Sequence, residues 1–138
     1  MPFVARAREF LRNPQQFLDN AHIQTHRQNE MIATVSFLLQ QAQPINKETI
    51  LRHLNTTVNR GSRISDTQWQ QEVLDPLRDA GVFIGSSNRG YFIPPGRDLA
   101  IEAYKFYVKR IIAESQRLGI LADLIRRGGW DLPNISID

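Results

Sequence analysis

One stretch of the chain, residues 64–95, constrains the fold more than any other. It reads ISDTQWQQEVLDPLRDAGVFIGSSNRGYFIPP and joins a helical pattern directly to two short apolar runs. Trp69, Val73 and Leu77 recur at helical spacing and form one apolar stripe, so we predict a helix over residues 65–80. The stretch as a whole predicts a helix that leads straight into a hairpin.

The two ends of this helix carry their own signals. Ser65 or Asp66 can cap its first turn by accepting a hydrogen bond from a free backbone N–H. Gly81 supplies the positive φ that ends a helix without a Cβ penalty. Pro76 lies inside the helix and is expected to kink or shorten its last turn, because proline removes one backbone hydrogen bond.

The two apolar runs that follow predict strands. Residues 82–84 and 91–93 consist of β-branched and aromatic side chains, which favour extended structure. The segment between them, residues 85–90, has the composition of a turn and a glycine at each end. Pro94 ends the second strand because proline has no N–H to donate to a ladder. We therefore predict a hairpin over residues 82–93.

Apolar patterns elsewhere predict further helices. They cover residues 3–12, 30–42, 46–55 and 97–118. Asn46 is a suitable N-cap for the helix over 46–55. Gly119 is expected to end or bend the helix over 97–118. The fold class is therefore mainly α with a small β-hairpin.

The order of these elements resembles the winged helix-turn-helix DNA-binding superfamily of the bacterial and phage type. The residues that carry the resemblance are the stripe of helix 30–42, the helix capped by Asn46, the spacing Trp69-x3-Val73-x3-Leu77-x3-Gly81, and the hairpin end Gly90-Tyr91-Phe92-Ile93-Pro94. The loop over residues 56–64 departs from the pattern, because it is longer than the turn of a simple helix-turn-helix.

This resemblance implies a winged helix of three core helices plus a wing over residues 30–96. An N-terminal helical extension over residues 1–29 and a C-terminal helix and tail over residues 97–138 flank it. The resemblance further implies that the third helix enters the major groove of double-stranded DNA and that the wing touches the backbone.

The residues that would then contact DNA lie on the third helix, before it, and at the wing tip. Glutamine pairs with the N6 and N7 atoms of adenine, and arginine and lysine bind phosphate. The candidates are Lys47, Arg60, Arg63, Ser65, Thr67, Gln68, Gln70, Gln71, Asn88 and Arg89.

The charge distribution gives this interpretation only partial support. The formal net charge is +3, and the basic excess lies in residues 1–63, with eight Lys and Arg against four Asp and Glu. The predicted recognition helix is itself acidic, with Glu72, Asp75 and Asp79 in its second half. A lone protomer is therefore expected to bind DNA weakly.

The sequence predicts no catalytic, metal or cofactor site. It contains no cysteine, which excludes disulfides, thiol nucleophiles and cysteine-bound zinc. His22, His26 and Glu30 would align on one face if residues 19–30 were helical, but such spacing is more typical of a solvated surface. We expect a cytoplasmic protein, with no membrane span, that is not an enzyme.

The helix over residues 97–118 has an apolar arc wider than one small domain needs. A second interface is therefore expected there, with the N-terminal helix, a second protomer or both as its partner. The candidate dimerisation residues are Phe106, Tyr107, Ile111 and Leu118. A homodimer would present two recognition helices to half-sites about one DNA turn apart.

Three functional hypotheses follow. The first is a dimeric transcriptional regulator that binds double-stranded DNA. The second is the DNA-recognition module of a larger phage, restriction or replication enzyme. The third is a winged helix used for protein–protein contact. The state of association separates the first from the second, and binding to duplex DNA separates both from the third.

Overall fold

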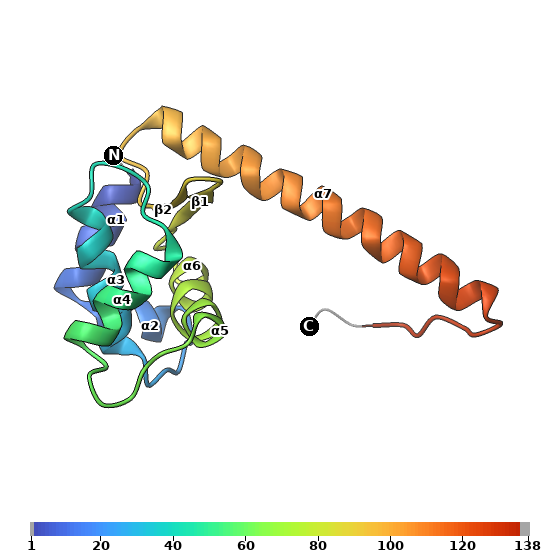
Figure 1. Ribbon diagram of the computed structural model, residues 1–138, viewed down its shortest axis with the longest axis horizontal. Coiled ribbons are helices and arrows are strands. Elements are labelled where there is room, and N and C mark those ends of the chain that lie inside the picture. The colour runs from blue at the N-terminus through green and yellow to red at the C-terminus, as the bar shows by residue number, and fades with distance from the viewer. Residues whose placement is uncertain (1, 136–138) are drawn as a thin grey trace. The chain divides into compact units, whose positions relative to one another are not determined.

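The structure, a computed structural model, describes residues 2–135 (Figure 1). Contacts divide the chain into two compact units, Met1–Tyr104 and Lys105–Asp138. In chain order the elements are α1 (Pro2–Arg12), α2 (Pro14–Asn20), α3 (Gln28–Leu39), α4 (Lys47–Thr57), α5 (Asp66–Trp69), the π-helical segment η1 (Gln70–Leu74), α6 (Asp75–Asp79), β1 (Gly85–Ser87), β2 (Gly90–Phe92) and α7 (Arg97–Arg127). The structure is mainly helical with a small antiparallel hairpin, which confirms the coarse fold class.

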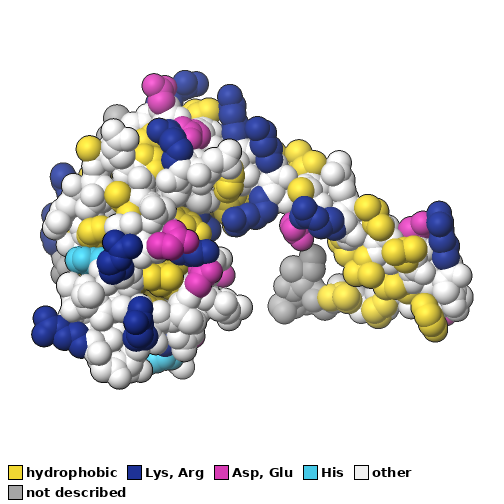
Figure 2. Space-filling model, viewed as in Figure 1, with side chains coloured by type: hydrophobic (Ala, Val, Ile, Leu, Met, Phe, Trp, Pro, Cys, Tyr) yellow, Lys and Arg dark blue, Asp and Glu magenta, His cyan; other side chains and the backbone are white. Residues whose placement is uncertain are grey.

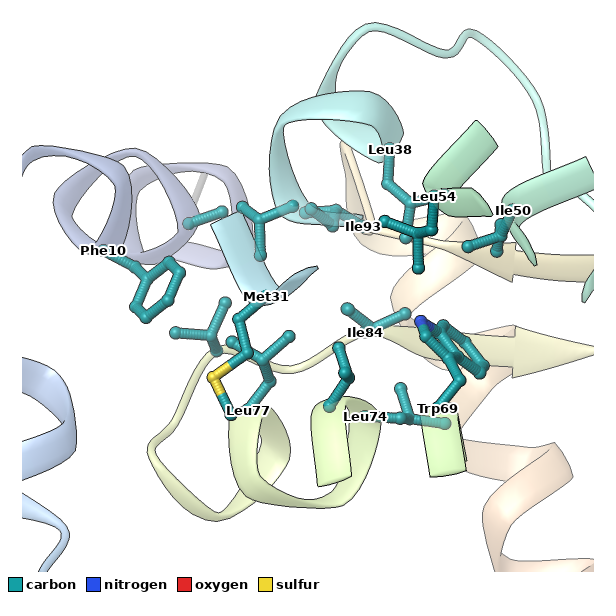
Figure 3. Packing of buried hydrophobic residues seen from close by; sticks show 14 of the residues in the cluster. Phe10, Met31, Leu38, Ile50, Leu54, Trp69, Leu74, Leu77, Ile84 and Ile93 are labelled. Atoms are coloured by element: carbon teal, nitrogen blue, oxygen red, sulfur yellow. The ribbon is translucent and has the colours of Figure 1, made fainter. Parts of the chain in front are cut away.

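A shared hydrophobic core holds the first unit together. Phe10 of α1, Met31 of α3 and Leu77 of α6 converge in the close-up of Figure 3 and are fully buried. Helix α1 packs on α3 through this core. The segment 1–29, predicted as an extension, therefore shares its core with residues 30–96. Met1 and residues 136–138 of the predicted terminal segments lie outside the described residues.

The predicted helix caps are confirmed. Asn46 accepts a hydrogen bond from the backbone N–H of Thr49 at the start of α4 (2.9 Å). Ser65, rather than Asp66, caps α5, and its hydroxyl accepts from the N–H of Gln68 (3.2 Å). Gly81 has a φ of +86° just after α6. These signals act over a few residues, which is why the sequence alone locates them.

Three helix ends differ from the prediction. Helix α3 ends at Leu39 rather than 42, because the next two N–H groups bond to carbonyls only three residues back and tighten the last turn. Helix α7 continues through Gly119 to Arg127, so the predicted end at Gly119 is wrong. The predicted helix 46–55 corresponds to α4, which extends to Thr57.

Pro76 widens the predicted third helix before its last turn. The helix passes through α5, η1 and α6 without interruption, and the N–H of Asp75 bonds to the carbonyl of Gln70, five residues back. A proline ring clashes with the carbonyl four residues before it, which here belongs to Glu72. The wider π turn moves that carbonyl out of the way.

The hairpin is shifted toward the C-terminus relative to the prediction. Strand β1 covers residues 85–87, which were predicted as turn, and pairs antiparallel with β2 in the register Gly85↔Phe92. The predicted first strand, 82–84, is wrong because two of its backbone groups form hydrogen bonds with residues of α6. The N–H of Val82 donates to Leu77 at the helix end (2.9 Å), and the carbonyl of Ile84 accepts from Arg78 Nε (2.8 Å).

A single bridge ties the hairpin to the segment before α4. Ile45 and Tyr91 exchange two backbone hydrogen bonds of 2.9 and 2.8 Å. Gly90 has a φ of +126°, and a Cβ there would lie 2.4 Å from the carbonyl oxygen of Ile45. A glycine is therefore required for the hairpin to approach this closely.

The second unit contains the rest of α7, from Lys105 to Arg127, and the tail that follows. Within residues 2–135, none of the helices combines the length and the apolar character that crossing a membrane requires.

Candidate nucleic-acid interface

The structure brings three of the predicted DNA-contacting segments together on one face of the first unit. Gly90, next to the hairpin turn, abuts the backbone of Ile45 and Asn46. The next residue, Lys47, pairs through Nζ with Asp66 Oδ2 at the start of α5 (2.8 Å). The hairpin turn, the start of α4 and the start of α5 therefore lie side by side.

Trp69 and Tyr91 fix this arrangement from inside the core. The Trp69 indole is fully buried, and its Nε1–H donates to Thr34 Oγ1 on α3 (3.3 Å). The Tyr91 ring meets the indole edge to face, with ring centres 5.0 Å apart. Because Tyr91 also bridges to Ile45, this pair joins the hairpin, α5 and the start of α4.

Some predicted base-reading side chains are already engaged within the protein. Gln68 Oε1 accepts from the N–H of Ser65 (2.9 Å) and completes a capping box with the Ser65 hydroxyl. Gln70 Nε2 donates to Asp66 Oδ1 (2.8 Å). Ser65, Gln68 and Gln70 therefore stabilise the start of the helix.

Other predicted residues are exposed on the same face. Thr67 lies on α5, Gln71 on η1, and Asn88 in the two-residue hairpin turn. Arg63 lies in the loop before α5 and makes no hydrogen bond or ion pair with another residue of the described range 2–135. These four side chains are open to contact from outside.

The remaining two arginines have acceptors nearby. Arg60 Nε donates to the carbonyl of Thr56 at the end of α4 (3.0 Å). Arg89, in the hairpin turn, donates through Nη2 to both carboxylate oxygens of Glu102 on α7 (3.2 and 3.0 Å). Figure 2 accordingly shows basic side chains interspersed with acidic ones on the visible face of the first unit, without a continuous basic patch.

An ion-pair cluster beside this face was not recognised from the sequence. Arg27 donates to Glu30 Oε2 (2.8 Å) and to Glu72 Oε1 of η1 (3.1 Å), and His26 Nε2 lies 3.3 Å from the same Glu72 oxygen. The hydrogen bond to Glu30 raises the pKa of Arg27, which keeps this half-buried guanidinium charged. Arg27 and Glu72 are 45 residues apart, and no local signal connects them.

The helical alignment of His22, His26 and Glu30 does not form. Helix α2 ends at Asn20, and His22 has a φ of +55°. Glu30 is buried against Arg27 instead. Within the described part of the chain, no three metal-ligating side chains come together.

The paired charges of Lys47 and Asp66 predict an acid-sensitive contribution to stability. Their hydrogen bond lowers the pKa of Asp66 and raises that of Lys47. A carboxyl whose pKa is lower in the folded state stabilises the fold above its unfolded pKa, and this contribution is lost as the pH falls through the folded pKa. We expect a coupling below about 1 kcal/mol, since solvent screens the pair. We expect it to be lost in acid, as the pH falls through the lowered pKa of Asp66.

A double-mutant cycle of Lys47→Met and Asp66→Asn measures this coupling by urea unfolding. The cycle also removes the separate effect of Asp66 on the helix terminus, because that effect is common to both arms. Equal coupling free energies in neutral and strongly acidic buffer would contradict the prediction.

The candidate dimerisation residues do not share one face of α7. Tyr107, Ile111 and Leu118 are exposed, and Leu118 is 66% accessible. Phe106 is half-buried, and the guanidinium of Arg110 lies over its ring at 6.0 Å. Ile111 lies five positions after Phe106, so the Phe106 side chain points well away from those of the other three residues.

An open groove of about 570 Å³ lies elsewhere in the first unit, between α1, α2 and the end of α6. Arg6, Arg12, Glu9 and Asp79 contribute charges of both signs to it. None of the candidate DNA-contacting residues lines this groove.

Comparison of the chain with protein-family models, with curated proteins and with solved structures finds no match. The functional argument therefore rests on the geometry of the site itself.

Proposed function

We propose that this protein binds double-stranded DNA through the face formed by the starts of α4 and α5, η1 and the hairpin turn, and that it acts as a dimeric transcriptional regulator of winged-helix type. The observation that carries the proposal is the shared position of the hairpin turn, Lys47 and the start of α5. A helix and a hairpin turn placed side by side can touch a groove and the neighbouring backbone together.

Thr67 and Gln71 are the side chains best suited to read bases under this proposal. Both are exposed on the first turns of the α5–η1 helix. Glutamine can pair with adenine, and the threonine methyl can contact thymine. Arg63, next to them in the preceding loop, serves as a phosphate anchor.

The acidic residues of the α5–η1–α6 helix oppose DNA binding less than the sequence suggests. Glu72 accepts a hydrogen bond from Arg27, so part of its charge is balanced within the protein, although Arg27 is shared with Glu30. Asp75 and Asp79 lie in the second half of the helix, which leaves the groove in the expected docking. Glu102 is different, because it holds Arg89 of the hairpin turn.

The proposal predicts opposite effects for two single substitutions. Arg63→Ala removes a phosphate contact, so the slope of log affinity against log salt falls by about one. Glu102→Gln releases Arg89 for phosphate, so binding to DNA tightens several-fold at low salt. Fluorescence anisotropy of a labelled mixed-sequence duplex, titrated at several salt concentrations, measures both effects.

Two matched variants provide the controls. Arg117→Ala and Glu114→Gln remove the same charges from an exposed pair on α7, Arg117 Nη1 to Glu114 Oε1, in the second unit. They should leave the affinity and its salt slope unchanged. Absence of duplex binding by the wild type at low salt would refute the proposal.

One observation favours a second candidate function. Lys47 and Arg89 are already paired with carboxylates, so the face is nearly neutral apart from Arg63 and Arg60. A nearly neutral polar face suits protein contact as well as DNA. The same titration separates the two, because a protein-docking face gives no salt-dependent binding to duplex DNA.

A further inference from the structure

The distal part of α7, residues 105–127, is a helix with an exposed apolar side. Its exposed apolar residues, each more than half accessible, include Ile111, Ile112, Leu118 and Leu121. Figure 2 shows hydrophobic side chains gathered along the distal end of α7. Exposed apolar surface of this extent is unusual for an isolated monomer and marks an interaction surface.

This stretch of helix also has low intrinsic stability as an isolated helix. Its sequence includes several β-branched residues and Gly119, which lower helix propensity. In the described part of the second unit, residues 105–135, no other helix or strand is present to pack on it. A helix in this position needs a partner, because most helical stability in proteins comes from packing an apolar face.

The apolar side follows the spacing of a coiled coil. A row at alternating steps of three and four residues contains no charged side chain over two and a half heptads. Its members are Val108, Ile111, Ser115, Leu118, Ala122 and Ile125. We call this row the α7 seam. Phe106 and Leu124 lie outside it.

We infer that the α7 seam pairs with the α7 seam of a second copy of this chain as an antiparallel two-stranded coiled coil. This inference deepens the dimeric part of the proposed function and names the interface and its orientation. The seam residues alternate between two sets, which are Val108, Ser115 and Ala122 in the first and Ile111, Leu118 and Ile125 in the second. In an antiparallel pair, each residue of the first set faces a residue of the second set on the other helix. Ser115 then faces Leu118 of the partner subunit, Ala122 faces the partner's Ile111, and Val108 faces the partner's Ile125.

Side-chain volume favours this orientation. Antiparallel pairing places each small seam residue opposite a large one, which fills the interface evenly. A parallel pair would instead stack Ser115 on the partner's Ser115 and Ala122 on the partner's Ala122. Two layers would then be underfilled, and cavities in an apolar interface are destabilising.

The state of association of the full chain tests the interface. Sedimentation equilibrium should show a dimer for the wild type, and Leu118→Glu should weaken dimerisation by at least about 100-fold, because it places a charge in the apolar seam. Leu124→Glu is the matched control, since Leu124 is 56% exposed on the same helix but off the seam. It should leave the dimer unchanged.

Cysteine cross-linking tests the orientation. The chain has no native cysteine, so each introduced thiol is unique. A mixture of the Val108→Cys and Ile125→Cys variants should form a mixed disulfide on oxidation, whereas Val108→Cys alone should not cross-link. Cross-linking by Val108→Cys alone would overturn the antiparallel arrangement.

Three other results would overturn the inference, namely a monomeric wild type, equal effects of the two leucine variants, or no mixed disulfide. Circular dichroism confirms that each variant keeps its helical content. The test is separable from the DNA titration. A monomer that binds DNA overturns this inference and the dimeric part of the proposal but leaves DNA binding standing. A dimer without duplex binding overturns DNA binding and leaves this inference standing.

Discussion

Replacing Trp69 with alanine is expected to lower the free energy of unfolding by about 3–5 kcal/mol, enough to unfold most of a marginally stable domain. The indole is fully buried and joins three parts of the fold. It donates to Thr34 of α3, meets the ring of Tyr91 on β2, and belongs to the helix that begins with α5. Alanine leaves a cavity at this junction and leaves the buried Thr34 hydroxyl without its donor.

Urea unfolding followed by circular dichroism measures this loss. Trp130→Ala is the matched control, because Trp130 is the only other tryptophan of the chain and its side chain is 68% exposed. That control should change the free energy of unfolding by less than about 0.5 kcal/mol. A loss below about 1 kcal/mol for Trp69→Ala would show that the junction does not depend on the indole.

Replacing Arg27 with methionine is expected to destabilise the fold by about 3–5 kcal/mol. The substitution keeps a long apolar side chain but removes the donor that Glu30 and Glu72 share. Only 7% of the Glu30 side chain is exposed, so its carboxylate would remain buried without a charged partner. Breaking a buried ion pair from one side is costly for this reason.

The double variant Arg27→Met with Glu30→Gln separates two contributions to the loss of stability. One is the lost attraction between Arg27 and its carboxylates, and the other is the cost of leaving the Glu30 charge buried without a partner. The glutamine carries no charge, so the double variant should regain a large part of the stability that Arg27→Met loses. Arg8→Met, at an exposed position of α1, controls for the loss of one positive charge. Equal stability of the single and double variants, measured by urea unfolding, would contradict the role assigned to the buried Glu30 charge.

The sequence by itself determined those features that depend on a few neighbouring residues. Apolar spacing located the helices, and the hydrogen bonds that Asn46 and Ser65 accept from nearby N–H groups set two helix starts. Gly81 marked a helix end, because its positive φ suits glycine. The mainly helical class with one hairpin follows from such local signals alone.

The tertiary structure alone decided the position of the first strand. Residues 82–84 have strand-like composition, but the helix end and Arg78 occupy the backbone groups of Val82 and Ile84. Pairing then begins at Gly85, where a Cβ would lie 2.8 Å from the Cβ of Ala103 on α7. Composition cannot report these contacts. The two hydrogen bonds are local but depend on how the helix ends, and the approach of Gly85 to Ala103 joins segments that are distant in the chain.

The tertiary structure likewise decided which candidate site residues are paired with a carboxylate and which are exposed. Lys47 binds Asp66 and Arg89 binds Glu102, whereas Arg63 is left exposed, although all three carry a full positive charge. The sequence identified these residues as cations near a helix and a hairpin turn. It did not identify their partners, because electrostatic pairing depends on distances in space, and those distances exist only once the helices and the hairpin have packed on a common core.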